Sequence, residues 1–111
     1  MNKKAMDILA SVYQKCNAIF PNGLHDAFLY GSYARGDYDQ WSDVDILLTV
    51  DLDYIEIEKY TDLVAQVSSD LSLDNDVFVS VTVKPLEQFL KYNNILPYYK
   101  NVLKEGIRYA V

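Results

Sequence analysis

The chain has 111 residues, of which 50% are hydrophobic, and its formal net charge is −6 at pH 7. This length suits a single domain over residues 1–111, and the hydrophobic content excludes a disordered protein. Proteins that bind long nucleic acids usually carry a basic face, so the acidic balance argues against that class. Short apolar stretches without a preceding basic region predict neither a membrane-spanning helix nor a signal peptide, and the lone Cys16 suits the reducing cytoplasm, where we expect the protein.

The first half of the chain predicts one helix and two strands. Apolar residues at helical spacing predict an amphipathic helix over residues 3–20, which Pro21 and Gly23 end. A short apolar run over residues 27–30 predicts a first strand. Residues 44–50, rich in Val, Ile and Leu, predict a second strand.

The second half continues with a helical stripe from Ile57 to Leu71. Residues 76–83 alternate between polar and apolar and predict a third strand, which Lys84-Pro85 ends. Residues 86–92 and 96–105 predict two short helices. This order predicts an α/β or α+β fold, with helices packed on a sheet of three or four strands whose order does not follow from the pattern.

Two aspartates stand at the start of the second predicted strand. Asp43 and Asp45 are two residues apart, and strand side chains alternate between faces, so both carboxylates project from the same face. Two adjacent carboxylates repel each other unless a cation lies between them. Hard oxygen ligands suit Mg²⁺ or Mn²⁺, and Mg²⁺ is commonly held by one or two carboxylates together with substrate phosphate oxygens. The pair therefore predicts a divalent-metal site that also takes a nucleoside triphosphate.

A glycine-containing loop follows the first predicted strand. Gly31 lets the backbone approach a ligand closely, and Ser32 adds a hydroxyl donor where a loop enters a helix and offers free N–H groups. Together these two residues would hold the terminal phosphates of a nucleotide. Arg35 would neutralise phosphate charge, and a surface salt bridge of little energetic value is an equal alternative.

A third carboxylate would complete the site. Asp76 begins the predicted third strand, and if that strand lies beside the second, Asp76 joins Asp43 and Asp45 as general base and as ligand of a second metal. Asp74 is the competing candidate. Asp76 is preferred because it directly adjoins the strand.

The block GSYARGDYDQWSDVDILL resembles the signature of the DNA polymerase β-like nucleotidyltransferase superfamily, and most of all its minimal nucleotidyltransferases. The matching positions are Gly31, Ser32, Arg35, Gly36, Ser42, Asp43 and Asp45. The resemblance implies the small nucleotidyltransferase fold, with a mixed sheet packed against helices. It also implies nucleotide binding by Gly31, Ser32, Arg35 and Ser42, and metal binding and catalysis by Asp43, Asp45 and Asp76.

The family implies transfer of a nucleoside monophosphate from a nucleoside triphosphate, with Mg²⁺, to a hydroxyl. Minimal members are commonly paired with a helical HEPN-domain ribonuclease toxin, and as antitoxins they can silence it by attaching AMP from ATP to a tyrosine. The resemblance implies this function here. Two alternatives stay open, namely transfer to a small molecule or an RNA end, and inhibition by binding without catalysis.

Aromatic residues are candidates for a partner surface, because tyrosine combines apolar area with a hydroxyl. The sequence has 10 tyrosines, and Tyr92, Tyr98, Tyr99 and Tyr109 lie near its C-terminal end. Filling of the core is the alternative for some of them. Trp41 is either a stacking or partner contact or a core residue that anchors the loop.

Overall fold

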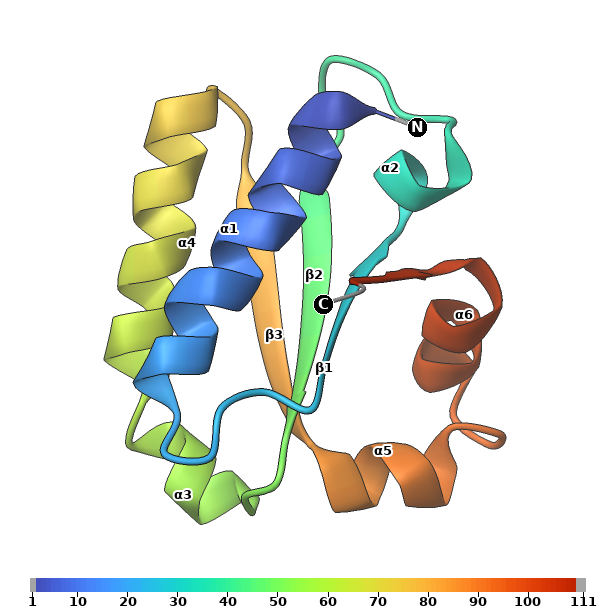
Figure 1. Ribbon diagram of the computed structural model, residues 1–111. Helices are drawn as coiled ribbons and strands as arrows, with labels where there is room; N and C mark the ends of the chain where they lie inside the picture. The colour runs from blue at the N-terminus through green and yellow to red at the C-terminus, as the bar shows by residue number, and fades with distance from the viewer. Residues whose placement is uncertain (1, 110–111) are drawn as a thin grey trace.

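The computed structural model describes residues 2–109, which form a four-stranded mixed sheet covered by helices (Figure 1). Its elements are α1 (Lys3–Ile19), β1 (Asp26–Tyr30), α2 (Ser32–Arg35), β2 (Val44–Val50), α3 (Tyr54–Glu58), α4 (Thr61–Asn75), β3 (Val79–Pro85), α5 (Leu86–Tyr92), α6 (Pro97–Glu105) and β4 (Ile107–Arg108). The strand order is β3-β2-β1-β4, with β2 and β3 parallel and β1 antiparallel to both β2 and β4. The predicted fold class is confirmed. Within residues 2–109, every helix is too short or too polar to cross a membrane.

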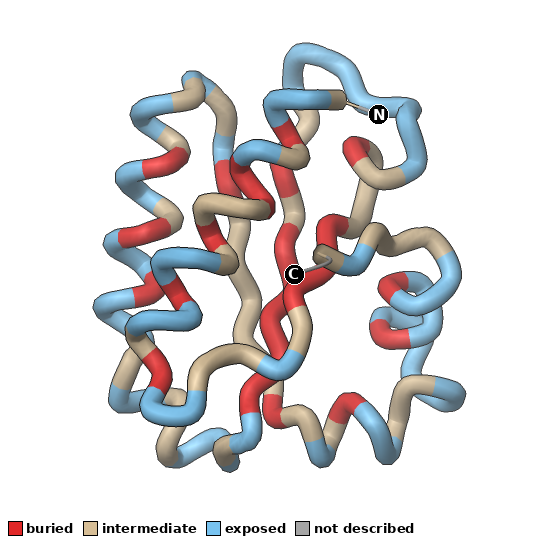
Figure 2. Tube along the Cα trace, in the orientation of Figure 1, coloured by how far each residue is buried: buried red, intermediate tan, exposed pale blue. Residues whose placement is uncertain are grey.

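The main core lies between the sheet and the helices α1 and α4. The side chain of Asn2 accepts a hydrogen bond from the N–H of Ala5 at 2.9 Å and so caps α1, which buries its apolar side against the strands. Alternate strand residues such as Leu29, Val44 and Ile46 meet this helix layer and are fully buried. Figure 2 shows the buried segments running along the central strands and along the sheet-facing sides of α1 and α4.

The opposite face of the sheet is only partly covered. Phe28 of β1 and Leu47 of β2 pack there against Phe89, Tyr99 and Val102 of α5 and α6. Helix α5 follows β3 directly and lies at the end of the sheet where β2 also ends, and α6 comes after it and packs beside β1. The other end of this face, where β2 and β3 begin, stays open.

Most predicted elements are present, and the main differences lie between Asp53 and Val79. The stripe from Ile57 to Leu71 belongs to two helices and not one. Asp53 accepts a hydrogen bond from the N–H of Glu56 at 2.9 Å and caps the short α3, after which α4 starts separately. The short strand β4 was not predicted, because two residues are too few to show an alternation.

The prediction that Asp76 begins the third strand is wrong. Asp76 is the C-cap of α4 in a left-handed conformation, with φ 51° and ψ 45°, and its N–H donates to the carbonyl of Ser72. The strand starts three residues later, at Val79, and runs through Pro85. Aspartate is one of the few residues other than glycine that readily ends a helix in this way, and the apolar alternation of residues 76–83 concealed that role.

Replacing Asp76 with glycine is expected to stabilise the fold, because glycine adopts a left-handed C-cap without strain from a Cβ atom. We expect the free energy of unfolding to rise by about 1 kcal/mol in Asp76→Gly, as measured by urea denaturation. The matched control is Asp74→Gly, two residues earlier and inside α4, which should lose about 0.3 to 0.5 kcal/mol instead, because glycine is a somewhat poorer helix former than aspartate. Destabilisation in both variants would contradict the C-cap assignment.

Candidate active site

The paired aspartates lie where β2 begins, on the open face of the sheet. Val44 stands between them and is fully buried in the core on the opposite face, so the carboxylates of Asp43 and Asp45 both project away from that core. In the sheet, Asp45 is flanked by Tyr30 on β1 and by Ser80 on β3. Asp43 is exposed, whereas Asp45 is partly buried.

The environment of Asp45 favours the presence of a cation. Burial raises the pKa of the Asp45 carboxyl, and the nearby charge of Asp43 raises it further, while Arg35 acts in the opposite sense. The ionised pair is therefore unfavourable in the protein alone. A divalent cation between the two carboxylates would remove this penalty, and two hard oxygen ligands on one open face fit Mg²⁺ or Mn²⁺.

Gly31 forms the turn between β1 and α2 and touches the acidic pair. Its φ is 77°, and a Cβ atom built on it would lie 2.6 Å from Oδ2 of Asp45. The Gly31 carbonyl accepts hydrogen bonds from the N–H groups of Ala34 and Arg35, both at 3.1 Å. The N–H of Ser32 belongs to the first turn of α2, where a helix leaves backbone donors without internal partners. The turn thus brings backbone donors beside the carboxylates.

Arg35 sits at the end of α2 in an exposed ion-pair network. Its Nε donates to Asp37 at 3.1 Å, and its Nη1 donates to Glu105 of α6 at 3.4 Å. These partners raise the pKa of the already basic Arg35 guanidinium. The surface salt bridge considered as an alternative for Arg35 is therefore present. The same side chain lines a cavity of about 240 Å³ with Gly31 and Tyr98, so it also faces the candidate site.

The loop before β2 is held by its own side chains. The hydroxyl of Ser42 accepts from the N–H of Asp39 at 2.9 Å and donates to its carboxylate at 3.3 Å. Asp39 also accepts from the N–H of Trp41. The Trp41 side chain is 82% exposed, so the expectation of a core residue that anchors the loop is wrong. Ser42 shapes the approach of the chain to Asp43.

The structure does not assemble the predicted set of three carboxylates. Asp76 ends α4, and Asp74 lies within the same helix. The β3 residue paired with Asp45 is Ser80, which carries a hydroxyl. Within residues 2–109, no group of three or more His, Cys, Asp or Glu side chains is arranged to hold a metal ion. The strand position from which the role of Asp76 was predicted is not the one that it occupies, and the role itself stays a prediction.

Two tyrosines complete the wall of the open face. The hydroxyls of Tyr30 and Tyr98 lie 2.9 Å apart, and their rings are 5.5 Å apart between centroids. Burial raises the pKa of Tyr98, and the hydrogen bond to Tyr30 raises it further. Of the two, only Tyr98 was predicted from the sequence, as a residue of a partner surface or of the core. Tyr30 shares a face with Asp45 and precedes Gly31, which is the signal that would have found it.

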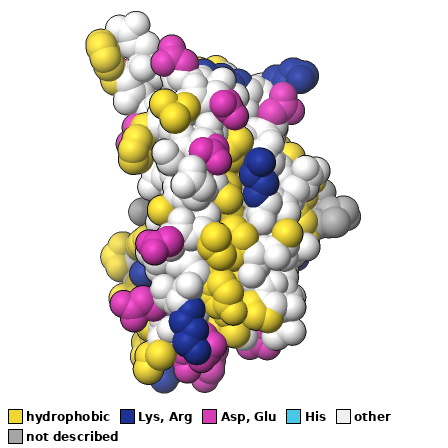
Figure 3. Space-filling view, turned by 90° about the vertical axis from the view of Figure 1, so that its left-hand side faces the viewer, with side chains coloured by type: hydrophobic (Ala, Val, Ile, Leu, Met, Phe, Trp, Pro, Cys, Tyr) yellow, Lys and Arg dark blue, Asp and Glu magenta, His cyan; other side chains and the backbone are white. Residues whose placement is uncertain are grey.

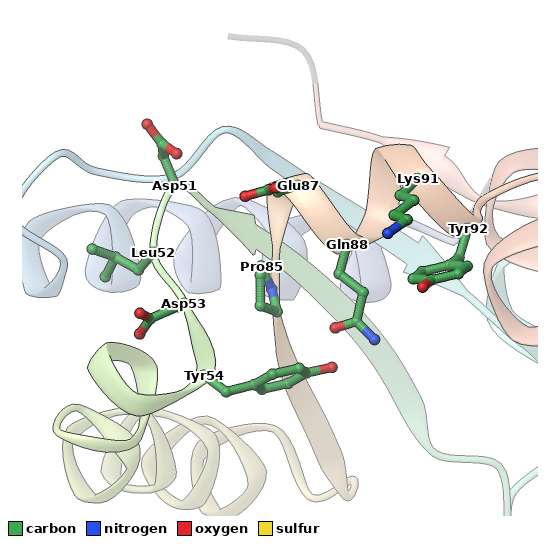
Figure 4. A pocket seen from close by; sticks show the side chains of 9 residues that line it. All are labelled: Asp51, Leu52, Asp53, Tyr54, Pro85, Glu87, Gln88, Lys91 and Tyr92. Carbon is green, nitrogen blue, oxygen red and sulfur yellow. The ribbon is translucent and has the colours of Figure 1, made fainter.

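A larger cavity, of about 400 Å³, lies at the other end of the sheet, where β2 and β3 end (Figure 4). Its lining includes three carboxylates, from Asp51, Asp53 and Glu87. Figure 4 shows that these side chains point in different directions and do not converge on one position. This cavity is separate from Asp43 and Asp45, and its geometry does not suit a metal ion.

Replacing Asp45 with asparagine is expected to raise the melting temperature of the metal-free protein at neutral pH. The raised pKa means that ionised Asp45 lowers stability as the pH rises through that pKa, and has no such effect below the ordinary aspartate pKa. The gain in Asp45→Asn should therefore vanish at acid pH. Mg²⁺ should stabilise the wild type and not the variant.

Thermal unfolding with and without Mg²⁺, at neutral and acid pH, measures both effects. Asp74→Asn, which changes the same charge at an exposed position on α4, is the matched control and should show neither. An Asp45→Asn protein that is less stable than the wild type at neutral pH would overturn the electrostatic assignment.

Replacing Gly31 with alanine is expected to displace the Asp45 carboxylate and weaken nucleotide binding. Gly36→Ala is the matched control, because Gly36 also has a left-handed φ, of 88°, but has nothing within 4 Å of an added Cβ. Both variants carry backbone strain, which is greater at Gly31 because its ψ of −156° is a conformation that essentially only glycine adopts, and only Gly31→Ala adds the contact with Asp45. Calorimetry with a non-hydrolysable ATP analogue and Mg²⁺ should show a larger loss of affinity for Gly31→Ala. Equal affinities in the two variants would move the phosphate site away from Gly31.

Solved structures share this fold. A toxin–antitoxin crystal structure with AMP-PNP matches with a TM-score of 0.56 and 18% identity, over 93% of this chain and 70% of that one. A mutant of the toxin–antitoxin MntA-HpeT matches with a TM-score of 0.53 and 17% identity, over 97% and 72%. A crystal structure of a candidate nucleotidyltransferase from Sulfolobus solfataricus matches with a TM-score of 0.55 and 22% identity, over 97% of this chain and 87% of that one. At these identities the likeness concerns the fold alone.

Sequence comparison is more specific. Residues 11–109 match the family described as Nucleotidyltransferase domain. A candidate protein adenylyltransferase of Methanocaldococcus jannaschii is 40% identical over 78 residues, which is 70% of each chain. A second candidate of that organism is 33% identical over 75 residues, 68% of this chain and 74% of the other. The chain therefore belongs to the nucleotidyltransferase family and is a nucleotidyltransferase enzyme.

Proposed function

We propose that this nucleotidyltransferase uses Mg²⁺ to move AMP from ATP to a tyrosine of a partner HEPN-domain ribonuclease, and that it acts as the antitoxin of that cytoplasmic pair. The observation that carries the proposal is the juxtaposition of the Asp43 and Asp45 carboxylates with the Gly31 turn on an open sheet face. The relatives named as candidate protein adenylyltransferases support AMP transfer to a protein. The fold shared with toxin–antitoxin proteins, one with AMP-PNP, supports the partner and the nucleotide.

The donor side of the reaction follows from the site. Asp43 and Asp45 would hold the metal, whose charge would offset the negative charge that develops on the phosphate oxygens. The first-turn N–H groups and hydroxyl of Ser32 would bind the terminal phosphates, because Gly31 lets this turn lie directly against the Asp45 carboxylate. Arg35, already held by Asp37 and Glu105, would add positive charge at the edge of the same site.

The acceptor side needs a group that takes a proton. A tyrosine hydroxyl has an ordinary pKa near ~10 and loses its proton as it attacks phosphorus. Asp76 is the C-cap of α4 and does not lie in β3 beside Asp45. This leaves Asp43, Asp45 and solvent as proton acceptors. Positioning beside the acidic pair, more than a dedicated base, is then the main contribution of the protein to this step.

A protein acceptor also agrees with the architecture. Within residues 2–109, the elements belong to the sheet and the helices around it, and none forms a separate module for binding an acceptor. A protein acceptor that contributes its own contact surface would not need such a module. The net charge of −6 suits a basic partner such as a ribonuclease, since opposite charges speed association.

Incubation of the enzyme with the ribonuclease, ATP and Mg²⁺ should add one or more AMP groups to a ribonuclease tyrosine. Intact-mass measurement followed by peptide mapping detects the change. Asp43→Asn should abolish it, because one of the two facing carboxylates is lost. Asp76→Asn is the matched control and should keep most of the activity, since Asp76 caps α4 and, within residues 2–109, forms no three-carboxylate group with Asp43 and Asp45.

Two results would contradict the proposal in different ways. Neutralisation of the ribonuclease without any mass change, and equally by Asp43→Asn, would replace it with inhibition by binding. Transfer of AMP to a small molecule or an RNA end, with the ribonuclease unmodified, would keep the enzyme class and change the acceptor.

A further inference from the structure

Strand β3 forms one edge of the sheet and pairs with β2 along its inner side only. The carbonyl of Phe78 accepts from the N–H of Val44 at 2.9 Å, so the even-numbered residues here point their backbone groups toward β2. Val79 points its groups outward, where Ser72 accepts from its N–H at 2.9 Å and Ser68 donates to its carbonyl. The serines of α4 thus close the first part of this edge.

Beyond Val79 the edge is open. Backbone direction repeats every two residues along a strand, so the N–H and C=O groups of Val81 and Val83 point outward like those of Val79. Within residues 2–109, these groups have no hydrogen-bond partner of the kind that Val79 finds in α4. An edge of this kind is a template for an added strand.

An uncharged groove of about 370 Å³ runs beside the open edge. Ile57 of α3, Val64 and Ala65 of α4, and Val81 and Val83 of β3 line it, and no charged residue does. Figure 3 looks onto this side of the molecule, where hydrophobic side chains gather in a strip with charged side chains to either side. The groove accepts apolar side chains on the face of the sheet that carries the main core.

The other face of the same edge leads to the candidate active site. Ser80 pairs with Asp45 and Thr82 with Leu47, so small polar side chains separate the edge from the acidic pair. Neighbouring strands lie about 4.8 Å apart, which places an added strand about 10 Å from β2. A tyrosine on that strand, leaning over Ser80, has a side chain long enough to cover most of this distance.

We propose that the open edge of β3 binds the acceptor protein through an extended segment that pairs with Val81 and Val83. The segment carries its target tyrosine on the active-site face and uncharged apolar residues at the adjoining positions, which enter the groove. The proposal rests on the proposed function, because it states how the acceptor of that reaction is held. The groove and the open edge connect to Asp45 through Ser80. This connection favours an acceptor segment over another occupant.

The transfer is then balanced as follows. A bond forms between the tyrosine Oη and the α-phosphorus of ATP, and the bond from that phosphorus to the oxygen bridging to the β-phosphate breaks. Pyrophosphate leaves, and the phenolic proton passes to a carboxylate of the acidic pair or to water. Tyr98, hydrogen-bonded to Tyr30, borders the path from the α6 side.

The test compares two edge variants with a matched control in the transfer assay to the ribonuclease. Val81→Pro removes an N–H group that points away from β2. Proline can be accommodated at such a position, because β3 already contains Pro85, whose backbone has the same orientation. Ala65→Glu places a charge in the groove from α4, and Leu73→Glu places the same charge elsewhere on that helix. We expect AMP transfer to fall about tenfold or more in Val81→Pro and Ala65→Glu, and to stay unchanged in Leu73→Glu.

Binding of a non-hydrolysable ATP analogue with Mg²⁺ should be equal in all four proteins, which shows that the donor site is intact. If the wild type modifies the ribonuclease and both edge variants do so equally well, this inference is overturned and the proposed function stands. If the wild type transfers no AMP to the ribonuclease, the proposed function fails first. Sedimentation that shows a wild-type dimer lost in Val81→Pro would assign the edge to a second copy of this chain instead.

Discussion

The close approach of Gly31 to Asp45 is the constraint on which the site depends. A side chain at position 31 would overlap the Asp45 carboxylate, and the backbone there takes a left-handed conformation that glycine adopts freely. The contact brings the end of β1 and the start of α2 against the first residues of β2. Backbone N–H groups and the two carboxylates therefore meet at one position, although Asp43 follows Gly31 by 12 positions in the sequence.

The acidic pair is tolerated because the sheet has two unlike faces. On one face, Val44 and Ile46 are fully buried beneath α1 and α4, which anchors β2 firmly. On the other face, α5 and α6 cover only the part around Leu47 and leave Asp45 half-exposed. A charge that is partly buried and close to a second charge raises the free energy of the folded protein, and a bound cation lowers it again. The stability of the site is thereby coupled to its ligand.

The C-terminal segment, with α6 and β4, borders the candidate site on the side away from β3. Helix α6 supplies Glu105 to Arg35 and Tyr98 to Tyr30, and β4 then pairs with β1 at the edge opposite to β3. Within residues 2–109, the β3 edge has outward backbone groups at Val81 and Val83 without a partner from α4. The candidate site is therefore bordered by α6 on one side and lies toward the open β3 edge on the other.

The sequence by itself determined the elements with strong periodicity and the common face of the two candidate metal-binding carboxylates. The apolar stripe of α1 and the run of β2 are local patterns, and the i, i+2 spacing of Asp43 and Asp45 places both carboxylates on one face of any strand. Tertiary structure alone decided the contact of Gly31 with Asp45, the meeting of Tyr30 with Tyr98, and the position of Asp76. Asp76 was misplaced because an apolar alternation cannot show where a helix ends, whereas α4 packs through Asn75 and needs a left-handed cap there. Strand order and side-chain meetings depend on contacts between distant segments, and local spacing carries no information about them.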